Sequence, residues 1–302
     1  FIGPQSSGKS TIAKIISFCF WLEKDVLLHR ITEYVDRAFI EKQVMEFHNL
    51  KNYFNEDYSI SFDSDILSLQ YNANVCTVKL KDTYREAKIG KIAYIPAERN
   101  TVNLPNISSL KLPENYTRSF IFDWLEIHTK YQKSNAINLP HLNLKYYYDE
   151  NKGDTLVLEN GKEIRLDEAS SGLQSVVPLY VYVHYLTQWI YENKEDISFK
   201  KQELIKQVVE NELFSLNGTL KEVADEFKNL LALENNLSRP HCSTIIIEEP
   251  ELNLFPETQK ELVYSLLSMI NKDRDRVIMT THSPYLLYAL NNCLLGYLAK
   301  DN

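Results

Sequence analysis

Residues 3–10 read Gly3-Pro4-Gln5-Ser6-Ser7-Gly8-Lys9-Ser10, which matches the phosphate-loop pattern GxxxxGK[ST] in full. The two glycines allow a tight backbone turn whose N–H groups point at phosphate oxygens. Lys9 supplies a positive charge for the phosphates, and the Ser10 hydroxyl can ligate Mg²⁺. The alternative is an ordinary Gly/Ser turn before a helix, but a chain with only 8 glycines in 302 residues is not expected to match this pattern by chance. The loop therefore predicts nucleotide binding.

A helix is predicted directly after the loop, because apolar residues recur at helical spacing over residues 10–29. Its N-terminus would carry partial positive charge toward a bound anion. A phosphate loop normally follows a buried strand, yet only Phe1 and Ile2 precede Gly3. The chain also stops at Asn302, soon after a predicted core strand, so we expect the sequence to be truncated at both ends.

A length of 302 residues suits one large α/β domain or two modest ones, and contents of 44% hydrophobic and 25% charged residues are ordinary for a globular protein. No apolar run approaches the roughly 20 residues that a membrane span needs, so we expect no membrane partner. The net charge of −8 gives no support to nucleic-acid binding, although a local basic patch stays possible in principle. The cysteines have no CxxC spacing and are typical of a reduced, cytoplasmic protein: Cys19, Cys76, Cys242 and Cys293.

The rest of the chain divides into predicted helices and strands. Helices are expected at 33–54, 120–130 and 172–192, the last containing Pro178, and two more in 199–236 with a break at Asn217-Gly218. Strands are expected within 59–81, at 91–96, 244–248 and 276–280, and in a hairpin over 155–166. We expect a type I′ turn at Asn160-Gly161 in that hairpin.

Two carboxylates end a buried strand in Thr244-Ile245-Ile246-Ile247-Glu248-Glu249-Pro250. A phosphate-loop enzyme needs one acid for the Mg²⁺ shell and often a second to orient the attacking water. We assign Glu248 to the metal and Glu249 to the water. An acidic turn that merely ends the strand is the alternative reading of this segment taken alone.

A second strand, over residues 276–280, leads to His282. A histidine at this sheet edge can hydrogen-bond a γ-phosphate or the attacking water. The other histidines are interpreted as structural: His29, His48, His128, His141, His184 and His241.

A Ser/Gly segment precedes the helix predicted at 172–192. Ser170 and Ser171 are natural N-caps, so a capped helix explains the segment by itself. A helix start with Gly172 is also a possible second anion site, for a nucleotide bound by another copy of the chain.

Together these segments resemble the ATP-binding-cassette class of ATPase, and more narrowly the head domains of the SMC, RecF and OLD (overcoming lysogenisation defect) groups of AAA-family ATPases. The resemblance implies that residues 3–10 are Walker A, 245–249 Walker B and 169–174 the signature loop, with Ser170 as the signature serine and His282 as the switch histidine. Residues 251–256 are similar to the D-loop region of the OLD-like branch. The order of the motifs matches the family.

The resemblance also implies a set of site residues. Nucleotide contacts are expected from Gly3, Pro4, Gln5, Ser6, Ser7, Gly8, Lys9, Ser10, Thr11, Ser170, Ser171 and Gly172. Catalytic roles fall to Glu249, His282 and Lys9, and Mg²⁺ ligation to Ser10 and Glu248.

The chain departs from the family pattern at several positions. Glu248 stands where most members have Asp, and Ser171 replaces the first signature glycine. No Q-loop glutamine follows the strand at 91–96, and Glu98 or Arg99 occupies its place. No long coiled coil is present, which argues against an SMC arm.

The expected fold class is α/β, a P-loop NTPase with a mixed sheet flanked by helices and an inserted helical and β-hairpin subdomain. We expect residues 1–302 to form a single ATPase domain, with a nucleotide-binding core lobe (1–100 and 241–302) and a helical lobe (101–240). The use of residues 193–240 is left open.

The resemblance implies a head-to-head homodimer with two ATP–Mg²⁺ sandwiched between Walker A of one chain and the signature loop of the other. Such a bacterial dimer would gate a partner activity, such as a TOPRIM-type nuclease, in DNA repair or antiphage defence. A slow-turnover nucleotide-dependent scaffold and a transporter ATPase subunit are the alternatives.

Overall fold

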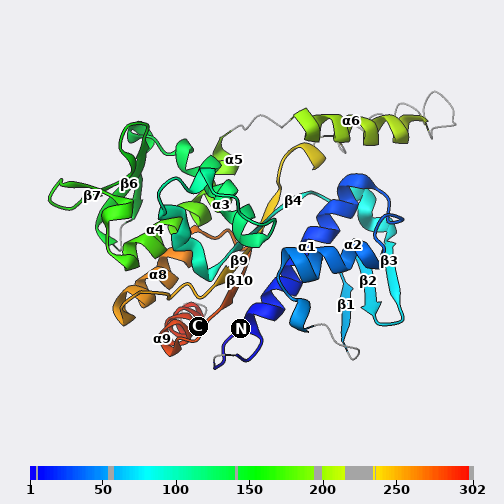
Figure 1. Ribbon diagram of the computed structural model, residues 1–302, viewed down its shortest axis with the longest axis horizontal. Coiled ribbons are helices and arrows are strands. Elements are labelled where there is room, and N and C mark those ends of the chain that lie inside the picture. The colour runs from blue at the N-terminus through cyan, green and yellow to red at the C-terminus, as the bar shows by residue number, and fades with distance from the viewer. Residues whose placement is uncertain are drawn as a thin grey trace. The chain divides into compact units, whose positions relative to one another are not determined.

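The computed structural model describes residues 1–4, 6–53, 58–139, 142–193, 199–214, 234 and 236–298. The fold is mixed α/β with a parallel sheet and helices, as the sequence predicts (Figure 1). The chain divides into two compact units. The first comprises Phe1–Ala13, Ala93–Trp189 and Ile245–Asn302, and the second comprises Lys14–Ile92 and Ile190–Thr244. The predicted division into a core lobe and a helical lobe stays a prediction.

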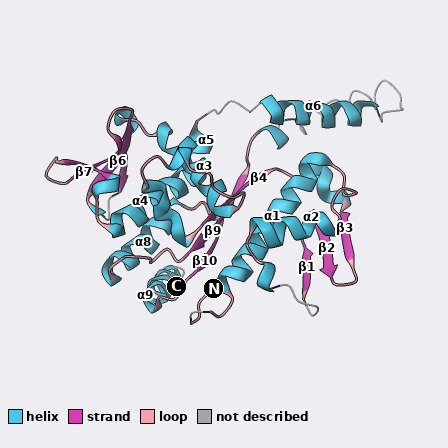
Figure 2. Ribbon diagram, viewed as in Figure 1, coloured by secondary structure: helices cyan, strands magenta, loops and turns pink. Residues whose placement is uncertain are grey.

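The secondary structure is largely helical, with short strands (Figure 2). The helices are α1 (Lys9–His29), α2 (Arg37–Glu41), α3 (Tyr116–Ile127), α4 (Ser171–His184), α5 (Ile190–Glu192), α6 (Phe199–Phe214), α8 (Pro256–Met269) and α9 (Pro284–Leu298). The strands are β1 (Ser59–Asp63), β2 (Leu67–Asn72), β3 (Cys76–Leu80), β4 (Gly90–Ile95), β5 (Ile137–Leu139), β6 (Leu144–Asp149), β7 (Gly153–Leu158), β8 (Glu163–Arg165), β9 (Cys242–Glu248) and β10 (Arg276–Thr280).

The sheet that leads to the candidate site has the strand order β10-β9-β4. Its middle strand is apolar on both faces, and Ile245, Ile246 and Ile247 are fully buried, as expected for the interior of a covered parallel sheet. Beside β10, Ile2 forms a parallel bridge with Thr281. Phe1 and Ile2 therefore run along the edge of this sheet. The phosphate-loop pattern predicts a strand at this place.

Helices of the first unit connect these strands and pack against one another. The chain passes from β9 through α8 to β10 and then into α9 (Figure 1), which is the crossover that parallel strands require. Helix α8 contacts both α9 and α4. Val263 of α8 is buried against Leu286 and Ala289 of α9.

A second, antiparallel sheet in this unit has the order β5-β6-β7-β8 and contains the predicted hairpin. Leu156 pairs with Ile164, but the predicted type I′ turn is wrong. That turn needs positive φ at both central residues. Only Gly161 has it, at 79°, and the Gly161 N–H donates to the Leu158 carbonyl at 2.8 Å.

Helix α4 begins at Ser171 and continues past Pro178 to His184. A proline inside a helix removes one N–H donor, so the carbonyl four residues earlier loses its helical partner. Here that carbonyl belongs to Gln174. The helix predicted over 172–192 is confirmed as α4, a π-helical turn at Tyr185–Trp189 and α5. The helix continues through Pro178, and the change of helix type occurs at the π-helical turn.

The second unit contains the antiparallel sheet β1-β2-β3, which confirms the strands predicted within 59–81. Phe18 and Leu22 of α1 share one core with Ile40 of α2 and with Leu67 and Leu69 of β2.

Several predicted helix limits are wrong, and capping side chains explain the starts. Helix α2 begins at Arg37, not 33, because Asp36 accepts a hydrogen bond from the Phe39 N–H, and a π turn continues it over Lys42–Phe47. Helix α3 begins at 116, not 120, because Asn115 caps it. In 199–236 the first predicted helix is α6, and the predicted break at 217–218 lies outside the described residues.

Candidate functional site

The phosphate loop turns sharply before helix α1. Ser6 and Gly8 have φ values of 60° and 81°, in the left-handed region that costs glycine nothing. The helix then begins at Lys9, so the backbone N–H groups of the loop and first turn gather at a helix N-terminus, as anion binding requires. Ser10 and Thr11 are half-buried in that first turn. Gln5 lies outside the described residues.

The Lys9 side chain folds back over its own loop and is only 8% exposed. Its Nζ donates to the Gly3 carbonyl at 2.8 Å and to the Pro4 carbonyl at 2.7 Å. The Ser7 hydroxyl lies 3.3 Å from the same nitrogen. The ammonium group is therefore held centrally within the turn.

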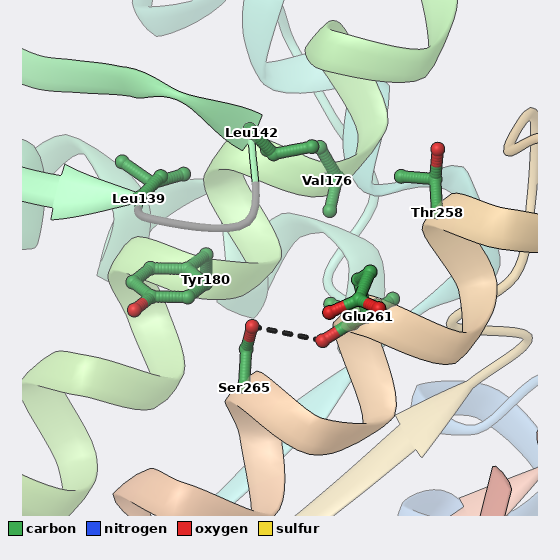
Figure 3. Close-up of a pocket in the computed structure, with 8 residues that line it drawn as sticks. Leu139, Leu142, Val176, Tyr180, Thr258, Glu261 and Ser265 are labelled. Atoms are coloured by element: carbon green, nitrogen blue, oxygen red, sulfur yellow. Dashed lines mark hydrogen bonds between the residues drawn. The ribbon is translucent and has the colours of Figure 1, made fainter.

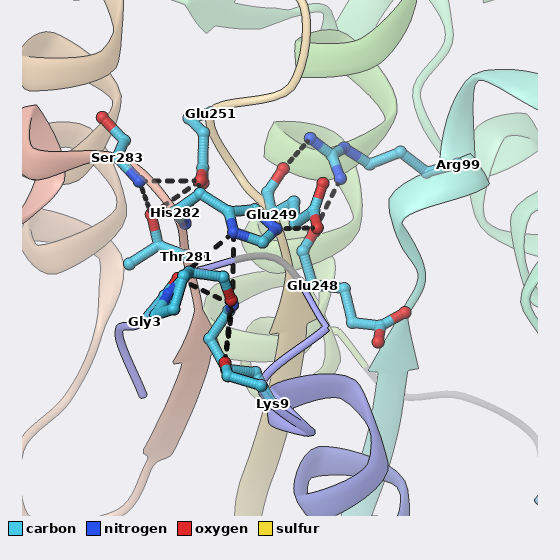
Figure 4. A network of polar contacts seen from close by, with 11 residues as sticks. Gly3, Lys9, Arg99, Glu248, Glu249, Glu251, Thr281, His282 and Ser283 are labelled. Carbon is cyan, nitrogen blue, oxygen red and sulfur yellow. Dashed lines mark hydrogen bonds and ion pairs between the residues drawn. The ribbon is translucent and has the colours of Figure 1, made fainter.

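His282 connects this lysine to the end of β9 (Figure 4). Its Nδ1 lies 3.2 Å from Lys9 Nζ, and its Nε2 lies 2.6 Å from Glu249 Oε1. An ammonium group can only donate, so Nδ1 accepts and we assign the ring proton to Nε2, which donates to Glu249. In this tautomer the 3.2 Å approach of Nδ1 to the Gly3 carbonyl is not a hydrogen bond.

The two carboxylates at the end of β9, Glu248 and Glu249, differ in environment. Glu248 is 3% exposed, and burial together with the nearby Glu248 carboxylate raises the pKa of Tyr94 well above its ordinary value. Within the described part of the chain, Glu248 Oε1 is buried without a hydrogen-bond partner. A buried, unsatisfied carboxylate oxygen is costly unless a cation or donor faces it. The donor types of Ser10 and Glu248, a hydroxyl and a carboxylate, suit the hard ion Mg²⁺.

Glu249 has an uncommon backbone conformation, with φ at 42°. A non-glycine residue in the left-handed region costs about 1 kcal/mol and persists only where its surroundings hold it. Here the Glu249 N–H donates to the Thr280 carbonyl at 2.9 Å. The Glu249 carbonyl accepts from Arg99 Nη2 at 2.9 Å and from the Leu252 N–H at 3.0 Å. Both peptide groups that flank the residue are therefore fixed.

Glu251 is a site residue to which sequence reasoning assigned no role. Its Oε1 accepts from the Thr281 hydroxyl and the His282 N–H, both at 2.7 Å, and from the Ser283 N–H at 3.2 Å. One carboxylate therefore caps the turn that carries His282, immediately before α9. The signals in the sequence are its place two residues after Glu249 and its position at the start of the D-loop-like segment 251–256.

Arg99 is the second residue whose role the sequence did not reveal. It lies in the 3₁₀ helix Ala97–Asn103 after β4, and its side chain is fully buried. Its guanidinium donates to backbone carbonyls of Pro96, Ser175, Glu248, Glu249 and Pro250. Burial lowers the pKa of Arg99 to about 10, which leaves the group charged at neutral pH.

The predicted signature loop forms the start of α4. The Ser170 hydroxyl caps the helix by accepting from the Leu173 N–H at 3.5 Å, and Ser170 and Ser171 are exposed. A Cβ on Gly172 would lie 3.0 Å from the Asn253 carbonyl, so this glycine allows a close approach to the loop after Glu249. No hydrogen bond or ion pair joins residues 170–172 to the described residues of the phosphate loop.

A small pocket elsewhere in the first unit lies between α4 and α8 (Figure 3). Leucines, Val176 and Tyr180 line it, and its Ser265 hydroxyl donates to the Glu261 carbonyl at 2.9 Å. The described lining contains an acid but no cation, so this pocket does not suit a phosphate.

The fold and site define a P-loop NTPase-like α/β protein. The AAA ATPase domain family matches residues 106–287, which is more than half of the chain, and the chain belongs to this family. The matched segment includes residues 169–174, 245–249 and His282, whereas the phosphate loop precedes it. The family description indicates ATP binding and hydrolysis. A comparison with curated proteins finds no match. No helix among the described residues has the length and apolar character to cross a bilayer.

Proposed function

We propose that this chain binds and hydrolyses ATP, with the triphosphate on residues 3–10 and Lys9 and the attacking water oriented by Glu249. One observation carries the proposal. His282 contacts Lys9 Nζ at 3.2 Å on one side and Glu249 Oε1 at 2.6 Å on the other. A candidate phosphate-binding cation and a candidate base therefore lie on either side of one imidazole. In-line attack on a γ-phosphate needs both kinds of group, one to stabilise the phosphate charge and one to orient the water.

The other residues of the site have complementary roles in this proposal. Ser10 and Glu248 would hold Mg²⁺, which neutralises charge on the β- and γ-phosphates. Glu249 accepts a proton from the attacking water, and the Nε2–H of His282 orients the carboxylate that accepts it.

We further propose that two copies associate head to head around two nucleotides, as in the SMC, RecF and OLD groups. The exposed Ser170 and Ser171 at the N-terminus of the 14-residue helix α4 support this arrangement, because such an end attracts anions. A partner activity in DNA repair or antiphage defence, with a TOPRIM-type nuclease or DNA as partner, rests on the family resemblance alone.

The test is ATP turnover by the wild type and by Glu249→Gln, with Glu257→Gln as a control at an exposed position on α8. We expect Glu249→Gln to lower kcat by at least about 100-fold while ATP still binds, because it removes only the base. Wild-type turnover in Glu249→Gln would refute the assigned role.

Sedimentation of Glu249→Gln with ATP tests the dimer, since slow hydrolysis preserves the sandwich. A strict monomer at saturating ATP would contradict head-to-head association. Negligible wild-type turnover, with and without DNA, would instead favour the nucleotide-dependent scaffold.

A further inference from the structure

Arg99 is fully buried and forms no ion pair with a carboxylate of the described residues, although Glu251, Glu249 and Glu248 lie close enough to favour its charge. A buried charge without an ion pair is costly unless dipoles replace the lost water. A guanidinium has five N–H groups, and five carbonyls receive them. Nε donates to Ser175, Nη1 to Pro96 and Glu248, and Nη2 to Glu249 and Pro250, at 2.9–3.3 Å.

Four of these carbonyls belong to two separate parts of the site, and that of Pro96 directly precedes the 3₁₀ helix of Arg99 itself. Figure 4 shows Arg99 beside Glu248 and Glu249. Ser175 lies in the second turn of α4, the helix that begins with the candidate signature loop. Glu248, Glu249 and Pro250 form the turn after β9 that holds the candidate base. Arg99 thus joins, through one rigid planar group, the start of α4 to the backbone of Glu249.

A second side chain of the same 3₁₀ helix strengthens this link. Asn103 Nδ2 donates to the Gln174 carbonyl at 3.0 Å. That carbonyl lacks its helical donor because residue 178 is a proline. The proline therefore frees a carbonyl at the start of α4, and Asn103 binds it one residue away from the carbonyl that Arg99 binds.

The strained backbone of Glu249 gives the link a functional consequence. With φ at 42°, Glu249 needs its flanking peptide groups to be held, and Arg99 binds the carbonyls on both sides of its Cα, those of Glu248 and Glu249. A Cβ added at Gly172 would lie 3.0 Å from the Asn253 carbonyl, so the start of α4 and the loop after Glu249 also approach each other closely there.

We propose that Arg99 is a positioning residue that fixes the Glu249 backbone relative to the first turns of α4, so that ATP turnover depends on it while ATP binding does not. The proposal rests on the function proposed above. It implies that a ligand at residues 170–172 acts on Glu249 through Arg99. The path consists of the hydrogen bonds from Arg99 to the Ser175 and Glu249 carbonyls.

The test is Arg99→Lys, which keeps the positive charge but cannot reach carbonyls on both segments with a planar fork. We expect kcat per bound nucleotide to fall about 10- to 100-fold, since small displacements of a reacting group cost this much. The ATP dissociation constant is expected to change by less than about twofold, because Arg99 forms no hydrogen bond with the phosphate-loop residues that the structure describes. The stoichiometry of bound ATP should stay at the wild-type value.

Arg274→Lys is the matched control. Arg274 also binds a backbone carbonyl, that of Thr187, and pairs with Asp275 at 3.0 Å. It precedes β10, whereas His282 follows the other end of that strand. A purely structural role for Arg99 would lower the fraction of molecules that bind ATP and leave kcat per bound nucleotide unchanged, as we expect for Arg274→Lys. That outcome in Arg99→Lys would overturn the proposal.

Asn103→Ala covers the case in which Arg99→Lys does not fold. It removes only the bond to Gln174 and the bond to the Asn100 carbonyl, and we expect kcat to fall about 3- to 10-fold with unchanged ATP affinity. Wild-type kcat in a folded Asn103→Ala would then overturn the link. If the wild type itself fails to hydrolyse ATP, the proposed function fails and this inference fails with it. If the wild type and Arg99→Lys turn over equally, only the inference fails.

Discussion

Two buried cations bind backbone carbonyls: Lys9 in the phosphate loop, and Arg99 where it joins α4 to the end of β9, here called the Arg99 junction. The two sets of carbonyls lie at very different distances from their cation along the sequence. Lys9 binds Gly3 and Pro4, within six residues of itself. Arg99 binds Ser175 and Glu248, which are 76 and 149 residues away. The phosphate loop is a local turn formed by consecutive residues. The Arg99 junction exists only once three separate segments have folded together.

This difference predicts different consequences of substitution. A change in the loop should affect ligand binding with little effect on stability, because its contacts are local and partly exposed. A change at the junction or beside it should affect turnover and stability together, because it leaves buried polar groups without partners.

The largest effect is expected for Lys9→Ala. We expect the ATP dissociation constant to rise by at least about 100-fold, because a charged hydrogen-bond donor to the phosphates is lost. The unfolding midpoint should change little. Equilibrium nucleotide binding and thermal unfolding measure the two properties, with Lys260→Ala on α8 as a control. Wild-type affinity in Lys9→Ala would show that residues 3–10 are not the site.

The next largest effect is expected for Glu251→Ala. The turn that carries His282 would lose its acceptor, leaving the His282 and Ser283 N–H groups and the Thr281 hydroxyl without this partner. We expect a loss of about 2–4 kcal/mol in the free energy of unfolding and roughly tenfold lower kcat from a displaced imidazole.

Glu251→Gln is the matched variant, because its amide oxygen can still accept from the same donors. We expect it to recover most of the unfolding free energy measured by urea denaturation. An equal loss in Glu251→Gln and Glu251→Ala would contradict the capping role.

A smaller effect is expected for Gly172→Ala. The new methyl would press on the Asn253 carbonyl at 3.0 Å, so we expect about 1 kcal/mol of destabilisation and a change in kcat of a few-fold. Ser171→Ala, at the exposed neighbouring position, is the control for stability. If Gly172→Ala gains stability, as a helical Gly→Ala change does where space is open, the close approach is not present in solution.

The smallest effect is expected for His48 in the second unit, whose titration changes the stability of the protein with pH but not the site. Burial lowers the pKa of His48 from 6.5 to about 3. The unfolded chain then binds a proton near pH 6.5 that the folded chain does not, so stability is retained above that pH and lost as the pH falls through it. Between pH 7 and pH 6 this amounts to about 0.7 kcal/mol.

His48→Gln should remove this difference, measured as the change in urea midpoint between pH 7 and pH 6. Turnover at a fixed pH should match the wild type, because His48 belongs to the second unit, whereas Lys9, Glu249 and His282 belong to the first. An unchanged pH dependence of stability in His48→Gln would show that this histidine is not responsible.

Much of the fold followed from local patterns. Helix α1, the strands β4, β9 and β10, and the start of α4 lie where apolar spacing, caps and glycines place them. The errors have local causes too. Asp36 and Asn115 act as caps that the periodicity did not reveal, and Asn160 does not adopt the positive φ that the predicted turn needs.

The sequence alone determined the phosphate loop and the two carboxylates after β9, because each lies within a few consecutive residues whose chemistry is recognisable without neighbours. It could not determine that His282 lies between Lys9 and Glu249, that Glu251 caps the His282 turn, or that Arg99 binds carbonyls of two distant segments. Those facts depend on which strand ends meet at one sheet edge and on which carbonyls a buried donor reaches. Only the packing of the folded chain decides such long-range contacts. Every residue has the same backbone carbonyl, so the sequence does not indicate which side chain will bind it.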